Sequence, residues 1–349
     1  MKKAVKILAA AMCIIVLFTS TVFGDYVYNY SSVSQQTKII DGIKEFFGNV
    51  RYILTYTSKT PTKSLCKIPE LEKNYVPQGF CYVDSEDMFA VTYYSADDLN
   101  SIVALIDATS GERIKTVVLH YEDGSDCKAH VGGCADIGDS LIISAGKSAR
   151  RLKIADILEA EDYGSVSFCG KLKTDMQASY LNAYKNLLIV GQFYTFTPDN
   201  QYETPKEHSL YYSKSKHNYA MCEVFDLRDM DAVFESETAT PMFMVSVPNS
   251  IQGVAYDGTC LVTSSSSTAY GNSFLRYYNL EKATVSEYNR GGTDVNLYII
   301  TEDMAEKTVK IEPMSEGIDY YGGKVAGIFE SGAKKFTARK KMSDICAFE

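Results

Sequence analysis

Three side chains of this 349-residue chain combine a type suited to acid–base chemistry with a position at the end of a predicted hairpin. Glu316 and Glu330 flank one predicted hairpin, and His130 precedes another. Two carboxyl groups about 5 to 9.5 Å apart can hydrolyse a glycosidic bond, although a pair taken from one hairpin is unusual for that reaction. The imidazole of His130 could act as a base or carry a proton. These three residues are therefore the candidates for catalysis by a hydrolase or a lyase.

Other catalytic and metal-binding patterns are absent from the sequence. It contains no GxSxG, HExxH or P-loop motif and no CxxC pair. Its four histidines are too few and too dispersed to support a multi-histidine metal site. The serine run Ser264 to Ser267 has no recognisable base partner. We therefore predict neither a metal nor a cofactor.

One unit recurs five times along most of the chain. Each copy is a short strand, a tight turn and a second apolar strand. The first strand contains Gly79, Gly133, Gly253 or Gly317, and Tyr180 takes this position in the third copy. A residue without a Cβ lets neighbouring backbones approach closely, as crowded inner strands require. The copies span residues 76–94, 130–146, 178–194, 251–265 and 315–331.

A third strand that ends in Asp or Asn follows most copies, at residues 102–107, 221–226 and 274–279. A fourth strand then completes the unit. Four antiparallel strands repeated five times predict an all-β fold, a five-bladed β-propeller over residues 64–349. The uneven spacing of the copies leaves six blades as the alternative.

The tail after the fifth copy is too short to complete a blade. Ser64 to Pro69 is predicted to join the last blade as a strand and to close the ring. Cys66 and Cys346 would then lie in neighbouring strands, and they are the predicted disulfide. The cysteines that lie within apolar strand patterns, and that we expect to pack as small hydrophobic side chains, are Cys81, Cys134 and Cys260.

The position of a ligand site follows from hairpin geometry. The start of the first strand lies beside the end of the second, so these residues of all five units share one end of the propeller. A long insert, residues 195–217, is predicted to lie over this end as a lid. The predicted ligand-binding residues are Gln78, Tyr93, Tyr94, His130, Lys147, Gln192, Tyr194, Gln252, Ser264, Glu316, Glu330 and Ser331, and Gln177 and Phe193 belong to the same group.

Several of these motifs also carry a family resemblance. The runs PQG at 77–79, HVGG at 130–133, QG at 252–253, EG at 316–317 and FESGA at 329–333 resemble those of a group of exported bacterial β-propeller proteins. The resemblance implies an architecture rather than a reaction. The chain is similar, more loosely, to propeller lectins, lactonases and glycosidases. No catalytic motif of those classes matches, so none of their catalytic residues is carried over.

The first 24 residues have the features of a signal peptide. Lysines precede the apolar run Ile7 to Phe18. The residues up to Gly24 then form a predicted signal-peptidase cleavage site. We predict a secreted or cell-surface protein, with an uncleaved anchor at residues 4–23 as the alternative. Residues 25–63 are predicted to form a leader with an amphipathic helix, whose apolar side chains are Ile39, Ile40, Ile43, Phe46, Phe47, Val50 and Ile53.

Composition limits the classes of partner. A net charge of -9 argues against nucleic acid and against an anionic membrane surface, which attract basic proteins. The membrane would be contacted only through an uncleaved N-terminal segment. Aromatic faces combined with amide and hydroxyl groups suit sugars and peptides. We therefore predict that the axial mouth binds an extracellular glycan or peptide. The alternatives are the hydrolase or lyase described above and a scaffold that binds a protein surface.

Overall fold

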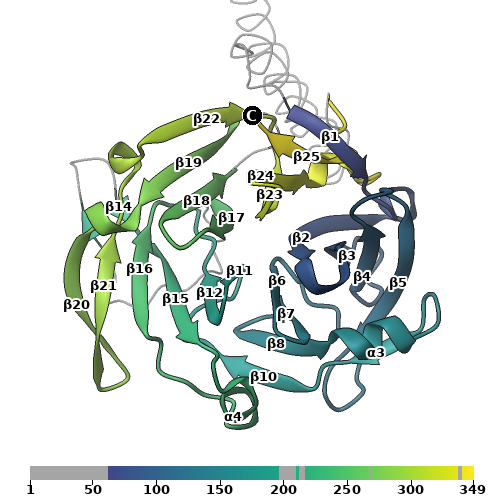
Figure 1. Cartoon of the computed structure of the whole chain (residues 1–349), viewed down its shortest axis with the longest axis horizontal. Coiled ribbons are helices and arrows are strands. Elements are labelled where there is room, and N and C mark those ends of the chain that lie inside the picture. The colour runs from purple at the N-terminus through teal and green to yellow at the C-terminus, as the bar shows by residue number, and fades with distance from the viewer. Residues whose placement is uncertain (1–61, 196–209, 212–216, 267–268, 270, 337–339) are drawn as a thin grey trace, which may run out of the picture. The chain divides into compact units, whose positions relative to one another are not determined.

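The computed structural model describes residues 62–349 except 196–209, 212–216, 267–268, 270 and 337–339. Five antiparallel sheets are arranged as blades around a central axis (Figure 1). The five-bladed β-propeller predicted from the repeats is therefore confirmed. The predicted signal peptide and the amphipathic helix of the leader lie outside the described residues.

Each blade has four strands that follow one another from the axis outward. In this order the first blade consists of β2 (Tyr75–Val83), β3 (Met88–Ser95), β4 (Ile102–Asp107) and β5 (Arg113–His120), and the second of β6 (Cys134–Ile137), β7 (Ser140–Ser144), β8 (Ser148–Lys153) and β10 (Gly170–Lys173). The third blade consists of β11 (Tyr180–Tyr184), β12 (Leu187–Gly191), β15 (Ala220–Asp226) and β16 (Phe243–Val247), and the fourth of β17 (Ile251–Tyr256), β18 (Cys260–Ser265), β19 (Ser273–Asn279) and β22 (Lys307–Ile311). The fifth blade consists of β23 (Ser315–Tyr321), β24 (Lys324–Phe329), β25 (Asp344–Phe348) and β1 (Thr62–Lys67).

Inserted strands extend two of the blades. β9 (Ser165–Ser167) leaves the second blade and pairs in parallel with β5 of the first. The hairpin of β20 (Thr284–Arg290) and β21 (Thr293–Ile299) leaves the fourth blade and pairs in parallel with β16 of the third. The remaining elements are short: the hairpin β13 (Leu210–Tyr211) and β14 (His217–Asn218), the helices α3 (Ile154–Glu159) and α4 (Met230–Glu235), and the 3-10 turns η1 (Leu71–Lys73), η2 (Asp84–Glu86), η3 (Leu280–Lys282), η4 (Glu302–Met304) and η5 (Glu330–Gly332).

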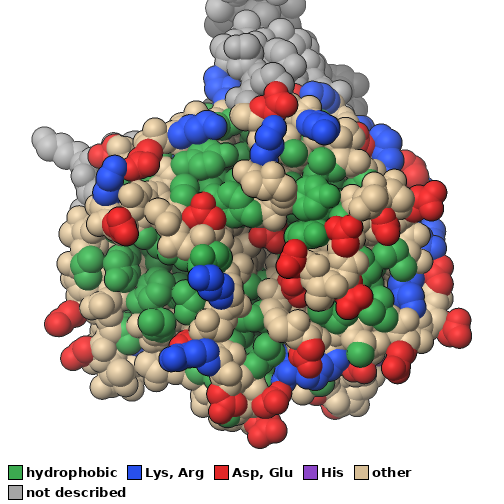
Figure 2. All heavy atoms as spheres, in the orientation of Figure 1, with side chains coloured by type: hydrophobic (Ala, Val, Ile, Leu, Met, Phe, Trp, Pro, Cys, Tyr) green, Lys and Arg blue, Asp and Glu red, His purple; other side chains and the backbone are tan. Residues whose placement is uncertain are grey.

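The hydrophobic core is divided among the contacts between neighbouring blades. Five apolar clusters each combine buried residues of two successive blades, including a cluster between the fifth blade and the first. A sixth, smaller cluster lies beneath the β20–β21 hairpin and includes Met176, Met221 and Leu297. Burial of apolar area therefore fixes each blade to both neighbours. On the face shown in Figure 2, basic and acidic side chains are interspersed with hydrophobic ones.

The inner strands approach one another too closely for side chains at certain positions. A Cβ on Gly133 would lie 2.2 Å from the backbone nitrogen of Leu181 in the next blade. Tyr180, which replaces glycine in the third repeat, is accommodated by a glycine on the partner strand. It pairs with Gly191, where an added Cβ would lie 1.8 Å from the Tyr180 ring. In this repeat the glycine therefore lies on the second strand of the hairpin instead of the first.

The ring closes as predicted, through pairing of β1 with β25. The disulfide predicted between these strands is not seen, because Cys66 and Cys346 are not partners in the strand pairing. A register shift in β1 places Ser64 opposite Cys346 and Cys66 opposite Ile345. The two thiols consequently belong to hydrophobic clusters on opposite faces of the blade.

Within the described part of the chain, no helix is long and apolar enough to cross a membrane.

Candidate functional site

A pocket with a volume of about 110 Å³ lies at one end of the propeller axis. Residues of all five blades line it, because each inner strand begins at this end. The lining side chains are largely amide, carboxyl and aromatic groups. The lining residues are Gln78, His130, Val131, Gly132, Gly146, Gln177, Ala178, Ser179, Phe193, Gln252, Glu316 and Glu330.

Two glutamates form the most strongly perturbed group in the pocket. Glu316 lies near the start of β23 and Glu330 directly after β24, and the pairing of Ser315 with Phe329 brings them together. Burial raises the pKa of Glu316 well above its ordinary value, and the charge of Glu330 raises it further. Burial also raises the pKa of Glu330, although hydrogen bonds from Glu316 and Gln78 partly oppose this effect. The directions of these two shifts favour a proton on Glu316, hydrogen-bonded to Glu330.

Two side-chain amides from other blades hold this carboxyl pair in place. Gln252 Nε2, on β17, donates a hydrogen bond to Glu316 Oε1 at 3.1 Å. Gln78 Nε2, on β2, donates to the carbonyl oxygen of Pro77 at 3.0 Å and lies 3.4 Å from Glu330 Oε2. Both amides stabilise negative charge on the pair, whereas burial favours the proton.

An aromatic stack borders the pocket beside the first and second blades. The imidazole of His130 lies against the ring of Tyr94, with centroids 4.2 Å apart. Burial, followed by the positive charge of Lys335, lowers the pKa of His130 to about 4. His130 is therefore neutral at pH 7 and could accept or donate a hydrogen bond without carrying charge. The Lys335 ammonium group donates to Tyr94 Oη at 2.9 Å.

The pocket also contains a hydroxyl group that has no partner among the described residues. Ser179 Oγ is buried and forms no hydrogen bond with the described part of the chain. Ser179 and Lys335 were not predicted from the sequence, since Ser179 lies in a connection before β11 and Lys335 in a loop beyond η5. A solvent or ligand group in the pocket could satisfy the serine hydroxyl.

Seven of the residues predicted to bind ligand do not line this pocket, and one of them, Tyr94, borders it through its stack on His130. Tyr93 is fully buried in the apolar cluster between the fifth and first blades, because strand alternation points it away from Tyr94. The hydroxyl of Ser264 bonds that of Ser315 at 2.7 Å, and Ser331 Oγ accepts from the backbone nitrogen of Met342 at 3.4 Å. Lys147 is exposed, Gln192 is fully buried, and Tyr194 stacks on Tyr219 with centroids 4.7 Å apart.

The predicted lid falls largely outside the described residues. Within residues 195–217, the structure describes Tyr211 and His217 as a backbone pair in the β13–β14 hairpin. The imidazole of His217 lies against Tyr219, with centroids 3.8 Å apart. A role for this insert over the pocket stays a prediction, as do the ligand contacts of the lining residues.

A second set of buried polar groups lies toward the other end of the axis. Asp319 accepts hydrogen bonds from Asn182 Nδ2 at 2.9 Å and from the backbone nitrogen of Tyr82 at 3.0 Å. Asn182 Oδ1 in turn accepts from the backbone nitrogen of Tyr256 at 3.0 Å. These bonds connect the inner strands of four blades. Burial raises the pKa of Asp319, and also that of Asp136 in the remaining blade, to about 6.

The titration of Asp319 predicts a pH dependence of stability. Because its pKa is higher in the folded state, folding retains a proton that the unfolded chain loses above pH 4. The contribution to the free energy of unfolding is therefore complete below about pH 4 and is lost as the pH rises to about 6. We expect the variant Asp319→Asn to lack this loss, so that its stability relative to the wild type improves from pH 4 to pH 6.

Urea denaturation of both proteins across this pH range measures the difference. The amide also removes a hydrogen-bond acceptor, which shifts the stability of the variant by a constant amount. The change of the difference with pH is therefore the relevant quantity. Parallel curves for the two proteins would show that Asp319 does not titrate in this way.

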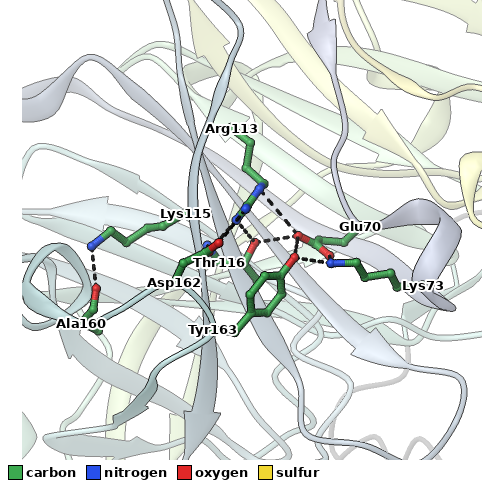
Figure 3. Close-up of polar contacts among 8 residues, drawn as sticks. All are labelled: Glu70, Lys73, Arg113, Lys115, Thr116, Ala160, Asp162 and Tyr163. Carbon is green, nitrogen blue, oxygen red and sulfur yellow. Dashed lines mark hydrogen bonds and ion pairs between the residues drawn. The ribbon is translucent and has the colours of Figure 1, made fainter.

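A further charged cluster joins the ring-closing segment to the first blade (Figure 3). Glu70 precedes η1, and its Oε1 accepts hydrogen bonds from Thr116 Oγ1 at 2.8 Å and from Tyr163 Oη at 2.6 Å. Lys73 forms an ion pair with Glu70 Oε2 at 3.1 Å, and Arg113 forms two bonds with Asp162 at 2.6 and 2.7 Å. Arg113 and Thr116 of this cluster lie on outer strand β5, and none of its residues lines the pocket, so we interpret it as structural.

Replacement of Glu70 by glutamine is expected to lower the free energy of unfolding by about 1 to 2 kcal/mol at pH 7. Burial raises the pKa of Glu70, but hydrogen bonds from Tyr163, Thr116 and Lys73 outweigh this and lower it overall. The stabilisation is therefore present above the unfolded pKa and is lost as the pH falls. Urea denaturation at pH 7 and pH 4 measures both effects. An equal loss at both values would contradict the role of the charge.

Side chains that could bind a metal ion do not gather among the described residues. These residues contain no group of three or more His, Cys, Asp or Glu side chains arranged to hold a metal ion. The pocket presents two carboxyl groups that share a proton, and a shared proton competes with a cation for the same oxygens.

Comparison with known proteins adds information on the fold. No family model and no curated protein matches the chain. Among solved structures, glutaminyl cyclase of Myxococcus xanthus is 10% identical, with a TM-score of 0.43 over 84% of this chain and 97% of that one. A luciferin-regenerating enzyme is 10% identical, with a TM-score of 0.38 over 82% and 94%. Apo AztD of Citrobacter koseri is 13% identical, with a TM-score of 0.33 over 72% and 56%. These neighbours are β-propeller proteins, and the likeness concerns the fold alone.

Proposed function

We propose that this protein binds the end of an extracellular glycan or peptide in the axial pocket. The observation that carries the proposal is the buried carboxyl pair, Glu316 and Glu330, which faces the pocket together with side-chain amides. Buried polar groups are costly unless they have partners, and they recur where a protein receives a polar ligand. The predicted signal peptide would place such a ligand outside the cell.

The charge of the pocket narrows the chemistry of the ligand. With one proton shared, the carboxyl pair carries close to one negative charge. Neither lysine nor arginine is among the residues that line the pocket, and His130 is neutral. An anionic group would therefore be repelled. Hydroxyl groups of a sugar, or the ammonium group at a peptide N-terminus, can donate to Glu330 and to the amide oxygens.

The aromatic side chains around the pocket fit the same ligands. Phe193 contributes to the lining, and the Tyr94–His130 stack borders it. An aromatic ring covers an apolar sugar face or an aliphatic side chain while polar groups engage the pocket floor. The volume of about 110 Å³ accommodates a terminal group rather than a long chain segment.

Isothermal titration calorimetry with small probes tests this proposal. The probes are neutral disaccharides, disaccharides that carry carboxylate or phosphate groups, and dipeptides with free amino termini. We expect measurable heat with the neutral disaccharides or the free dipeptides, but none with disaccharides that carry carboxylates or phosphates. Binding confined to the anionic probes, or absent from every probe, would contradict the proposal.

Acid–base catalysis is the second candidate, and the shared proton favours it. Enzymes raise carboxyl pKa values by burial and by pairing, so that one carboxyl donates and the other accepts a proton. Glu316 would be the acid and Glu330 the base. The pKa of each glutamate is shifted by a hydrogen bond to the other, whereas in ordinary glycosidases the two carboxyl groups are about 5 to 9.5 Å apart and act separately. This geometry therefore favours a proton-sharing dyad over the standard glycosidase mechanism.

A further inference from the structure

Two buried cysteines face each other where the first and second blades meet at the axis. Cys81 lies on inner strand β2 and Cys134 on inner strand β6. Their sulfur atoms are 3.1 Å apart. Each side chain is at most 1% exposed, and both belong to the apolar cluster between these blades. The fold therefore brings together two thiols that are 53 positions apart in the sequence.

The backbone geometry around this pair explains the short distance. A Cβ on Gly79 would lie 2.8 Å from the backbone nitrogen of Cys134, so the two inner strands are in close contact here. An S–S bond measures about 2.05 Å, so the sulfur atoms need to approach by about 1 Å. A shift of this size is within the range of side-chain rotation about Cα–Cβ bonds.

We propose that Cys81 and Cys134 form a disulfide bond that links the first and second blades when the protein folds under oxidising conditions. The proposal replaces our expectation that both residues remain packed thiols. It is independent of the ligand bound in the pocket. The predicted export of the protein would supply the oxidising conditions in which such bonds persist.

The reaction requires an oxidant with a disulfide of its own, such as oxidised glutathione or a disulfide-bearing oxidoreductase. The thiolate of one cysteine attacks this disulfide, forms a mixed disulfide and releases one thiol. The second cysteine then attacks the protein sulfur of the mixed disulfide and releases the second thiol. Two protein thiols are thus oxidised, and the oxidant gains the two electrons and two protons.

The surroundings of the pair determine when this reaction takes place. Burial raises the pKa of the Cys81 thiol well above its ordinary value, so the folded reduced protein holds little thiolate there. The bond should therefore form during folding, before the two strands are covered. Once formed, it should resist reductants until the protein unfolds.

The bond would also bear on the pocket. Gln78 lies three residues before Cys81, and Val131 and Gly132 lie just before Cys134. A covalent link between the strands would hold these two walls of the pocket at a fixed separation. Cys169, which is exposed, lies away from this contact and provides a control position.

The test compares the full chain refolded in a buffer of oxidised and reduced glutathione with the same chain refolded in dithiothreitol. Thiols are counted in denaturant, and a digest without reductant identifies linked peptides by mass spectrometry. We expect two fewer reactive thiols than the nine cysteines of the chain after oxidative refolding, and a linked peptide that contains Cys81 and Cys134. The linked peptide should persist in Cys169→Ser and disappear in Cys81→Ser.

The peptide map of the wild type decides the result even if the Cys81→Ser variant does not fold. Nine reactive thiols after oxidative refolding would overturn the proposal. A linked peptide that joins Cys66 to Cys346, with Cys81 and Cys134 free, would also overturn it. Resistance of the Cys81–Cys134 link to dithiothreitol in the folded protein, and its loss in denaturant, would support the proposed shielding.

Discussion

The variant Glu330→Gln is expected to bind a neutral disaccharide or a free dipeptide about 10- to 100-fold more weakly than the wild type. The substitution keeps the size of the side chain but removes the negative charge that faces the pocket. A hydrogen bond to a charged group contributes about 1.5 to 3 kcal/mol, which corresponds to this range of affinity. Calorimetric titration of both proteins with the probe that binds the wild type measures the change.

The same variant should fold at least as stably as the wild type at pH 7. The pKa of Glu330 is raised in the folded protein, so its favourable contribution is present below the unfolded pKa and is lost as the pH rises. Glutamine does not titrate, so the Glu330→Gln variant lacks this dependence of stability on pH. Glu287, which is exposed on β20, provides a matched control, and Glu287→Gln should bind as the wild type does. Equal affinities for Glu330→Gln and Glu287→Gln would contradict the proposed site.

Glu316→Gln separates binding from catalysis. A glutamine at this position reproduces the protonated acid, because its amide group can donate to Glu330 and its oxygen can accept from Gln252. Binding should therefore change little in this variant. An acid–base reaction would be abolished, since an amide cannot transfer the proton. Loss of binding together with retained folding would show that Glu316 is ionised and contacts the ligand directly.

The variant Gly133→Ala is expected to lose about 3 kcal/mol or more of unfolding free energy. The added Cβ would lie 2.2 Å from the backbone nitrogen of Leu181 and 2.6 Å from the carbonyl carbon of Tyr180. Backbone atoms of the adjacent inner strand cannot rotate away as a flexible side chain can. Relief therefore requires the second and third blades to separate at the axis. Urea denaturation monitored by far-ultraviolet circular dichroism measures the loss.

Gly291→Ala is the matched control for this substitution. Gly291 lies in the exposed turn between β20 and β21, with φ of 59° and nothing within 4 Å of an added Cβ. Alanine there introduces backbone strain of about 1 to 2 kcal/mol without steric overlap. A similar loss in both variants would show that inner-strand contact does not limit the side chain at position 133.

The repeat was readable from the sequence because it is local. Each hairpin lies within about twenty residues and carries its own turn, glycine and apolar strands. In the third repeat, tyrosine occupies the usual glycine position at 180 and its strand partner is Gly191. The hairpin itself is unchanged, so the sequence pattern still predicts its register. β9 and the β20–β21 hairpin could not be placed in the same way. They pair in parallel with the preceding blade, and parallel pairing leaves no turn signal between the partners.

The location of the pocket could also be predicted from the sequence. The direction in which an individual side chain points could not be predicted in every case. Hairpin geometry brings Gln78, Gln252, Glu316 and Glu330 to one end of the axis, and all four line the pocket. Tyr93 shares that strand end but belongs to the core, because neighbouring residues of a strand point to opposite faces. The partners of these residues depend on bulges, such as the shift between Ser315 and Ile318, that the sequence does not mark.

A crystal structure of the full chain grown with the disaccharide and dipeptide probes tests the central claim most directly. The account predicts density for a ligand group in the axial pocket, within hydrogen-bond distance of Glu330 and of Gln78 or Gln252. Ordered water alone in the pocket, with a probe bound at the outer strands or at no position, would contradict the axial binding site.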